Sequence, residues 1–477
     1  MKKTVLLLII LLSASALAGG VEFDRYFENK TLRVDFFITG NAQEEDVTLD
    51  QIKIEGEWAG SPNHLIDDFI KGAYFIKAYD VASNRLIYSR GFDCIYGEYI
   101  TTTPAIEGAK RSYHHSALLP LPKRPIRFVL EKGDRENIYR VAWVKTIDPA
   151  DYHILREGPP QGVIVYKAHE SGAPQKCVDL VYVGDGYATK EVKQFKKDCD
   201  RYVEVLFSIE PYKSYRHRFN ITGVLLPSAE SGVDEPRQGR YVKTAVSSSF
   251  NAFDIPRYLL TEDNKAYRDI AGAVPYDAIV ILVNDERYGG GGIYNFYGLT
   301  TVNHELSENV FLHEFGHSFS GLGDEYYTSA TAYNEFYPDG VEPAEPNVTR
   351  LLDPENVKWK ALVSPGMDVP TDWNKKAYDA LGAKAGKLRG DVRRAQKGSD
   401  ARKALQAELV EVQKKLAAVN QENRALAGKV GAFEGAGYSS EGLYRPELHC
   451  LMFSNVRKAY CAVCRAAVER MIKFYID

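Results

Sequence analysis

The chain has 477 residues, of which 45% are hydrophobic, and its formal net charge is −4 at neutral pH. This length and apolar content are enough for two or three domains with a substantial core. The near-neutral charge, without a basic helix that carries aromatic residues, excludes a nucleic-acid-binding surface, and no stretch has the roughly 20 apolar residues of a membrane span.

Residues 1–18 have the pattern of a secretory signal peptide. Lys2 and Lys3 precede an apolar run over residues 5–12, and the small residues Ala16 and Ala18 mark a cleavage site. We expect cleavage after Ala18. The mature protein would then be secreted or periplasmic.

Residues 19–165 have the pattern of a separate β-rich domain. The segments 31–37, 127–130 and 139–143 alternate in polarity and are rich in β-branched and aromatic residues. We therefore expect a β-sandwich. His114 and His115 are adjacent on a strand and point in opposite directions, so we interpret them as surface residues and not as metal ligands.

The second predicted domain, residues 166–477, begins in an α/β order. We expect strands at 178–183, 220–226 and 277–283 and a helix at 190–209.

A run of four glycines at 289–292 follows these elements. It lacks the spacing of a dinucleotide-binding loop and would let the backbone lie flat beside a cleft. Just after it, residues 299–303 either form an edge strand that pairs with an extended peptide substrate or belong to an ordinary loop.

The sequence HEFGH at residues 313–317 carries the clearest chemical signal. On a helix, positions i and i+4 share one face, so His313 and His317 can each point a ring nitrogen at one zinc ion, with Glu314 beside it. Apolar residues at helical spacing predict that this helix is buried, and Gly321 is well placed to end it.

A catalytic zinc ion usually has three protein ligands and keeps a fourth position for water. Gly321 and Gly323 allow a sharp turn after the helix, so Asp324 can fold back toward the metal. We predict that His313, His317 and Asp324 bind one catalytic Zn²⁺. In the alternative, Asp324 only orients a ligand, and Glu325 or a distant residue is the third ligand.

The segment 373–430 has a different pattern. Apolar residues recur at alternating spacings of three and four on both sides of a break at 397–400, which predicts an antiparallel helical hairpin inserted into the second domain. It holds 14 Lys and Arg against 6 Asp and Glu, a net charge of +8. The hairpin either gates the cleft, self-associates or contacts an acidic surface, or it is only a solvated decoration.

Export makes disulfide bonds the expected state of the six cysteines. Cys177 can pair with Cys199, and Cys450 with Cys461 or Cys464, although sequence alone does not give the connectivity. The alternatives are a structural zinc site at Cys450, Cys461 and Cys464, or a redox pair at Cys461 and Cys464.

The HEFGH motif followed by GLGDEY at 321–326 resembles the signature of the IgA-peptidase-like zinc metallopeptidases. This metzincin-related family uses an aspartate as its third zinc ligand. The segments 179–187, 289–292, 433–438 and 444–452 and the N-terminal domain are also similar to the family. Ordinary metzincins have a third histidine six residues after the second, where this chain has Gly323.

The resemblance implies further roles. Met452 would form the Met-turn under the zinc ion, and Tyr438 and Tyr444 are candidates for stabilising the transition state.

The predicted fold is multidomain, with an N-terminal β-sandwich and an α/β metzincin-like zinc metallopeptidase domain that carries the inserted helical hairpin. The predicted function is that of a secreted endopeptidase, in which a zinc-activated water attacks the peptide carbonyl and Glu314 is the general base. Its partners would be protein or peptide substrates. The alternatives are a catalytically silent extracellular binding protein on the same fold and a zinc hydrolase of non-peptide amides. The intact base and both histidines favour the peptidase.

Overall fold

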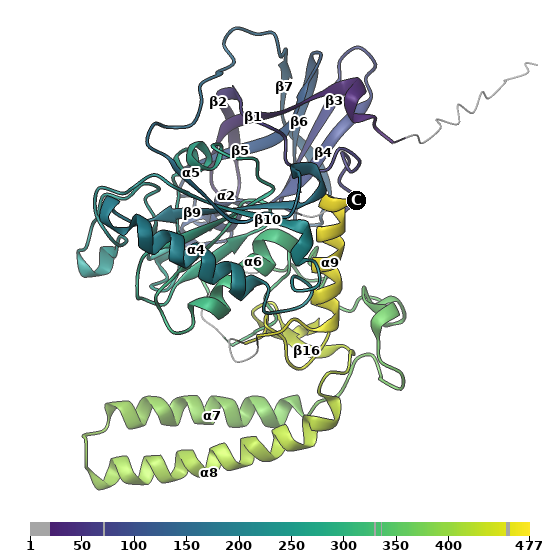
Figure 1. The fold of residues 1–477 in the computed structure, drawn as a ribbon. Coiled ribbons are helices and arrows are strands. Elements are labelled where there is room, and N and C mark those ends of the chain that lie inside the picture. The colour runs from purple at the N-terminus through teal and green to yellow at the C-terminus, as the bar shows by residue number, and fades with distance from the viewer. Residues whose placement is uncertain (1–19, 70–71, 329–330, 335, 455–457) are drawn as a thin grey trace, which may run out of the picture.

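The computed structural model describes residues 20–69, 72–328, 331–334, 336–454 and 458–477. An N-terminal β-rich domain lies on a larger α/β domain, and a helical hairpin projects from the opposite end (Figure 1). The predicted signal peptide at residues 1–18 lies outside the described residues. Among the described helices, none combines the length and the apolar character needed to cross a membrane.

The N-terminal domain contains two antiparallel sheets. Their strand orders are β2-β1-β5 and β4-β3-β6-β7. Alternate residues of β1, from Leu32 to Ile38, are fully buried, and the ring of Phe36 lies 6.0 Å from that of Trp143 on β7, so the two sheets share one core. This arrangement fits the predicted β-sandwich. The bounds are β1 (Phe27–Gly40), β2 (Glu45–Ile54), β3 (Tyr74–Asp80), β4 (Leu86–Phe92), β5 (Arg111–Pro122), β6 (Ile126–Gly133) and β7 (Tyr139–Ile147), with short helices α1 (Phe23–Tyr26), α2 (Ile95–Tyr99) and α3 (Thr103–Ile106).

The second domain is built on a six-stranded sheet in the order β14-β15-β13-β9-β10-β8. The four inner strands are parallel, whereas β14 and β8 run antiparallel to their neighbours. The bounds are β8 (Ile164–His169), β9 (Val178–Asp185), β10 (Phe219–Leu225), β13 (Ala278–Val283), β14 (Gly290–Ile293) and β15 (Tyr297–Thr301). Strand β8 spans the predicted domain boundary at residues 165 and 166. The small strands β11 (Ser249–Phe250), β12 (Leu259–Leu260), β16 (Phe433–Ala436) and β17 (Ser439–Arg445) form two separate pairs.

Both faces of the large sheet are covered. Val181 and Val183 on β9 belong to the core shared with the N-terminal domain and α5, while Leu180 and Tyr182 belong to the core under α4, α6 and α9. Side chains alternate across a strand, so one apolar run serves two cores. The helices are α4 (Val192–Leu206), α5 (Asn264–Ala271), α6 (Ser307–Ser320) and α9 (Ala462–Ile476).

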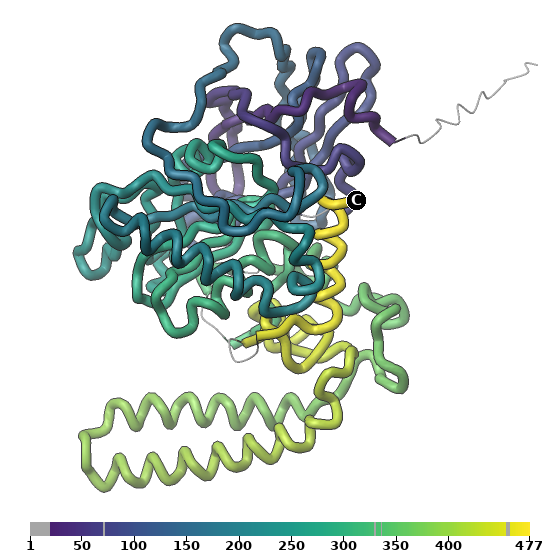
Figure 2. Tube along the Cα trace, in the orientation of Figure 1, coloured from purple at the N-terminus to yellow at the C-terminus, as the bar shows by residue number. Residues whose placement is uncertain are grey.

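The C-terminal helix α9 runs along the second domain as far as the N-terminal domain (Figure 2). There Asn63 donates a 2.9 Å hydrogen bond to the Asp477 carbonyl, and the rings of His64 and Phe474 stack. The end of α9 therefore contributes to the contact between the domains.

The glycine run forms the edge of the large sheet. For residues 299–303 we left open an edge strand and an ordinary loop, and the structure shows neither, because residues 299–301 belong to β15, which lies inside the sheet between β13 and β14. The edge strand is β14, which packs closely on α6. A Cβ atom at Gly292 would lie 2.4 Å from the Glu314 carbonyl oxygen, so only glycine allows this approach.

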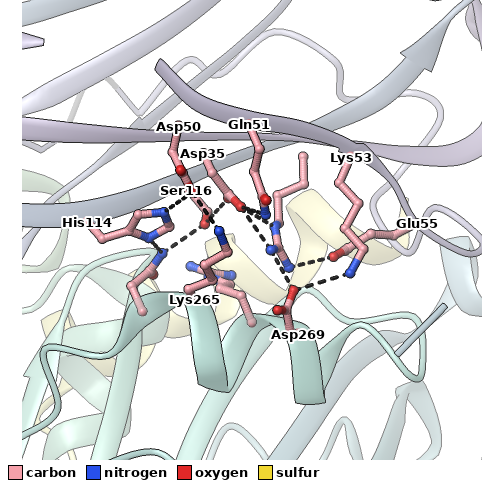
Figure 3. Close-up of polar contacts among 12 residues, drawn as sticks. Asp35, Asp50, Gln51, Lys53, Glu55, His114, Ser116, Lys265 and Asp269 are labelled. Atoms are coloured by element: carbon pink, nitrogen blue, oxygen red, sulfur yellow. Dashed lines mark hydrogen bonds and ion pairs between the residues drawn. The ribbon is translucent and has the colours of Figure 1, made fainter. Parts of the chain in front are cut away.

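A buried ionic network joins the domains (Figure 3). The guanidinium of Arg33 on β1 is completely buried and contacts Asp35 at 2.9 Å, Glu55 at 2.7 Å and Asp269 of α5 at 2.7 Å. Nearby, Lys265 of α5 forms a 2.9 Å ion pair with Asp50.

The prediction that His114 and His115 are surface residues is wrong, since α5 covers this strand. Asn264 of α5 donates a 2.9 Å hydrogen bond to His114 Nδ1. His115 is fully buried between Phe36 and Phe296, and neither of its ring nitrogens has a hydrogen-bond partner in the described part of the chain.

The hairpin consists of α7 (Lys375–Arg394) and α8 (Asp400–Glu422), which lie antiparallel to each other (Figure 1). Ala385, Leu388 and Val412 form its own small core. Asn374 donates a 3.1 Å hydrogen bond to Glu422, so the chain enters and leaves the hairpin at nearly the same point.

Candidate functional site

Helix α6 brings the two histidines of the HEFGH motif together. Their Nε2 atoms lie 3.0 Å apart. The helix ends at Gly321, whose φ of 59° is left-handed and turns the chain back toward the histidines.

This turn places Asp324 against both rings. Its Oδ1 atom lies 3.0 Å from His313 Nε2 and 3.3 Å from His317 Nε2, and it is buried without a hydrogen-bond partner among the described residues. In tetrahedral zinc sites with metal–ligand distances near 2.0–2.1 Å, neighbouring ligand atoms are about 3.3 Å apart. The three atoms thus fit one face of a zinc tetrahedron.

Backbone carbonyls hold both imidazoles from behind. His313 Nδ1 lies 3.2 Å from the Leu451 carbonyl oxygen, and His317 Nδ1 lies 2.5 Å from that of Leu322. A proton on each Nδ1 satisfies these carbonyls and leaves the Nε2 lone pair for a metal.

Asp324 is supported in the same way. The hydroxyl of Tyr438 donates a 2.5 Å hydrogen bond to Asp324 Oδ2. The other carboxylate oxygen, Oδ1, is left facing the histidines.

The three groups form a strongly coupled charge cluster. Burial disfavours the charged form of His317, but the negative charge of Asp324 outweighs it and raises the pKa of His317 to about 9. Burial opposes ionisation of Asp324 as well, yet the facing histidines hold the pKa of its carboxyl far below the usual range. The pocket is therefore built for a buried carboxylate beside positive charge, which a divalent cation also provides.

Met452 lies under α6, the helix that carries the HEFGH motif and is called the motif helix below. A Cβ atom at Gly316, the residue before His317, would meet Met452 Sδ at 3.1 Å and the Tyr460 hydroxyl at 2.9 Å. Met452 is fully buried, and its carbonyl accepts a 2.9 Å hydrogen bond from the Glu325 amide. Residues 451–452, called the methionine segment below, thus support both the motif helix and the chain beside Asp324, the third predicted ligand.

Glu314 faces a cavity of about 480 Å³, which His313, His317 and Asp324 also line. Burial raises the pKa of the Glu314 carboxyl, so its affinity for a proton is increased. The edge strand β14 runs along the same cavity.

Several residues of the cavity wall come from elsewhere in the chain and are not predicted by the sequence. Asp93 and Glu98, beside and within α2, bring the N-terminal domain into the wall. Burial raises the pKa of Glu98 to about 7. Other lining residues are Arg257, Tyr258, Tyr326 and Tyr333. No local motif marks these residues, because they reach the site only through the packing of the domains.

The remaining predicted residues lie apart from the three ligand atoms. Tyr444, on β17, does not line the cavity, whereas Tyr438 does. Glu325, the alternative third ligand, turns away from the histidines. Its Oε1 accepts hydrogen bonds from Asn347 at 3.0 Å and from the Cys464 thiol at 3.1 Å.

The predicted disulfide bonds are not formed, because all six cysteines are buried free thiols. The sulfur atoms of Cys450 and Cys464 are 3.7 Å apart, well beyond the roughly 2.05 Å of a disulfide bond. Cys199, on α4, packs against Gly223 of β10, whereas Cys177, just before β9, lies against Gly172.

Two family models match the chain. The model described as IgA Peptidase M64 matches residues 167–472, and the model described as Peptidase M64 N-terminus matches residues 22–144. No curated protein matches the sequence. The first match covers the motif helix, the methionine segment and the hairpin, and the second covers the two-sheet domain.

Proposed function

Because the chain belongs to the IgA peptidase M64 family of metallopeptidases, we propose that it is a zinc-dependent endopeptidase with His313, His317 and Asp324 as the metal ligands. The observation that carries this proposal is the triangle of two Nε2 atoms and the unpartnered Asp324 Oδ1, with sides of 3.0 to 3.3 Å. We further propose that the domain is metzincin-like, with Met452 as its Met-turn.

His313, His317 and Asp324 would hold the zinc ion, which would supply a Lewis acid for the substrate carbonyl and lower the pKa of a water molecule to about 7. Glu314 accepts the proton of the attacking water and passes it to the leaving amine nitrogen. Its raised pKa suits both steps, since the carboxylate must hold the proton before it donates it.

Tyr438 has a positioning role in this proposal. Its hydroxyl has one proton, and that proton is donated to Asp324 Oδ2. We therefore assign Tyr438 to holding the Asp324 carboxylate and not to stabilising the oxyanion. Tyr444 has no role at the reacting atoms in this mechanism.

The substrate is an extended peptide bound beside β14. This strand is an edge of the large sheet and lines the cavity. Tyr258 forms an isolated bridge with Gly290, and β12 packs against the strand. Main-chain hydrogen bonds to such an edge hold a peptide without selecting its side chains. The signal-peptide pattern of residues 1–18 supports the further proposal that the enzyme is exported.

The test is zinc analysis of the purified chain by mass spectrometry, combined with cleavage of an unbiased peptide library by wild type and Glu314→Gln. We expect both proteins to bind zinc and only the wild type to cleave, with a rate loss on the order of 10² to 10⁴ in the variant. Zinc binding without any Glu314-dependent cleavage would support the catalytically silent binding protein instead.

The ligand assignment has its own test. Asp324→Ala should lose the zinc ion that His317→Ala also loses. If Asp324→Ala kept that ion, the third ligand would have to be another residue.

A further inference from the structure

Four metal-binding side chains meet in a second cluster, separate from the two histidines. Glu325 follows Asp324 directly, Cys450 precedes the methionine segment, and Cys461 and Cys464 lie at the start of α9. Their ligand atoms all lie within 4.8 Å of one another.

The spacing of these atoms suits a tetrahedral ion. Cys450 Sγ is 3.7 Å from Cys464 Sγ, and Glu325 Oε1 is 3.1 Å from Cys464 Sγ and 3.9 Å from Cys461 Sγ. With zinc–sulfur bonds near 2.3 Å and zinc–oxygen bonds near 2.0 Å, the edges of a tetrahedron are about 3.5 to 3.8 Å long.

Without a cation, burying the charged groups of this cluster would be unfavourable in free energy. Glu325, Cys450 and Cys464 are completely buried, and Cys461 is 3% exposed. Glu325 Oε2 has no hydrogen-bond partner among the described residues. Asn347 donates to the other oxygen, Oε1, but it brings no charge. The positive charge of the buried Arg445 guanidinium acts on this carboxylate, and a bound cation would compensate the carboxylate and the neighbouring thiolates directly.

The backbone is arranged to support thiolates. The amide of Cys461 donates to Cys450 Sγ at 3.3 Å, and the amide of Cys464 donates to Cys461 Sγ at 3.4 Å. Cys461 is also the N-cap of α9, where the helix dipole favours negative charge.

We propose that Glu325, Cys450, Cys461 and Cys464 bind a second zinc ion with a structural role. Four protein ligands fill the coordination sphere and leave no position for water or substrate, as in structural zinc sites. A disulfide among these residues would leave the third thiol and the Glu325 carboxylate buried without a directly bound cation. The donor set of three thiolates and one carboxylate is typical of zinc and not of magnesium or calcium.

The second ion would hold in place the residues beneath the proposed zinc site at His313, His317 and Asp324. Glu325 is bonded through its backbone to Asp324, and Cys450 is next to Leu451, whose carbonyl faces His313 Nδ1. The ion would thus tie the third predicted ligand, the methionine segment and α9 together. This inference does not depend on peptidase activity, since a catalytically silent chain would need the same ion.

The test counts zinc in the full mature chain. We expect two zinc ions in wild type, one in His317→Ala and one in Cys464→Ser. Cys199→Ser is the matched control, because Cys199 is buried on α4 outside the cluster, and it should keep both ions. A single ion in wild type that disappears in His317→Ala would overturn the proposal.

A second measurement covers the case in which Cys464→Ser does not fold. Wild type reconstituted with Co²⁺ should show the intense near-ultraviolet charge-transfer band of thiolate ligation, which a site made of two histidines and an aspartate cannot give. The band should persist in His317→Ala. Absence of the band in the metal-loaded wild type, or a disulfide among the three cysteines found by mass spectrometry, would refute the proposal.

Discussion

The hydroxyl of Tyr438 donates a 2.5 Å hydrogen bond to Oδ2 of Asp324, although the two residues are 114 positions apart in the sequence. The bond orients the carboxylate so that Oδ1 faces the Nε2 atoms of His313 and His317. Partners of this kind hold a ligand in its binding position and strengthen its interaction with a metal.

We predict that Tyr438→Phe binds zinc at the histidine site about 10- to 100-fold more weakly than wild type, because the carboxylate loses its support. Competition with a chromophoric chelator measures this affinity. Tyr444→Phe is the control, since Tyr444 lies outside the cavity and should bind zinc as wild type does. Equal affinities in all three proteins would contradict the role assigned to Tyr438.

Gly316→Ala should lower the free energy of unfolding by about 1 to 3 kcal/mol, because its Cβ would press on Met452 Sδ and the Tyr460 hydroxyl. Denaturant-induced unfolding provides the measurement. Gly386→Ala on α7 is the control, since a Cβ there meets nothing within 4 Å and should not reduce stability. A Gly316→Ala variant as stable as wild type would show that the methionine segment can shift to accommodate the added Cβ atom without loss of stability.

The motif helix could be predicted from sequence because its information is local. The histidine spacing fixes one helical face, Gly321 ends the helix, and Asp324 follows within reach. The alternating residues of β1 and the period of α7 are local signals of the same kind.

Burial between domains could not be predicted in this way. The sequence predicts that His114 and His115 are surface residues, but α5 packs on their strand and buries them. The edge position of β14 depends on the order of the strands in space. Cys450 and Glu325 are similarly far apart in sequence, and only the fold brings them together. Such contacts depend on how whole elements pack, which no short window of residues contains.

Arg33→Met should reduce the free energy of unfolding by about 3 to 5 kcal/mol, because Asp35, Glu55 and Asp269 would remain buried or half-buried without their shared cation. Chemical unfolding monitored by fluorescence measures the loss. Arg111→Met removes an exposed ion pair with Glu262 and should cost less than about 1 kcal/mol. Similar losses in both variants would mean that the buried network contributes no more than a surface pair.

His115 should make the protein sensitive to acid. Burial lowers its pKa to about 3, whereas in the unfolded chain the pKa is near 6.5. Between these values the unfolded state binds more protons, so stability falls as the pH falls, by at most about 1.4 kcal/mol per pH unit from this group.

His115→Phe should remove that part of the slope without losing a hydrogen bond, since neither ring nitrogen has a partner among the residues that the structure describes. Unfolding free energies measured at about pH 6.5 and about pH 5 give the comparison. His217→Gln, at an exposed position, should keep the wild-type slope. An unchanged slope in His115→Phe would mean that His115 does not contribute to the acid sensitivity.

The outer part of the hairpin should be dispensable for folding and for cleavage of short peptides. Replacing residues 383–413 with a short Gly-Ser turn keeps the contacts at the base, where Tyr327 donates to Asp379 and Asn374 donates to Glu422. The removed part packs mainly on itself. Thermal unfolding and peptide cleavage are the measurements, and loss of zinc or of short-peptide cleavage would show that the hairpin tip supports the site.

The cavity wall is shared between the domains, since Asp93 and Glu98 come from the N-terminal domain, whereas the proposed metal ligands His313, His317 and Asp324 come from the second. Selection for new peptide substrates can therefore act on a domain that carries none of the predicted catalytic groups. Substitutions at Asp93 or Glu98 would alter what fits beside the metal while leaving the motif helix intact. The catalytic chemistry and the substrate preference can thus evolve in different domains of one chain.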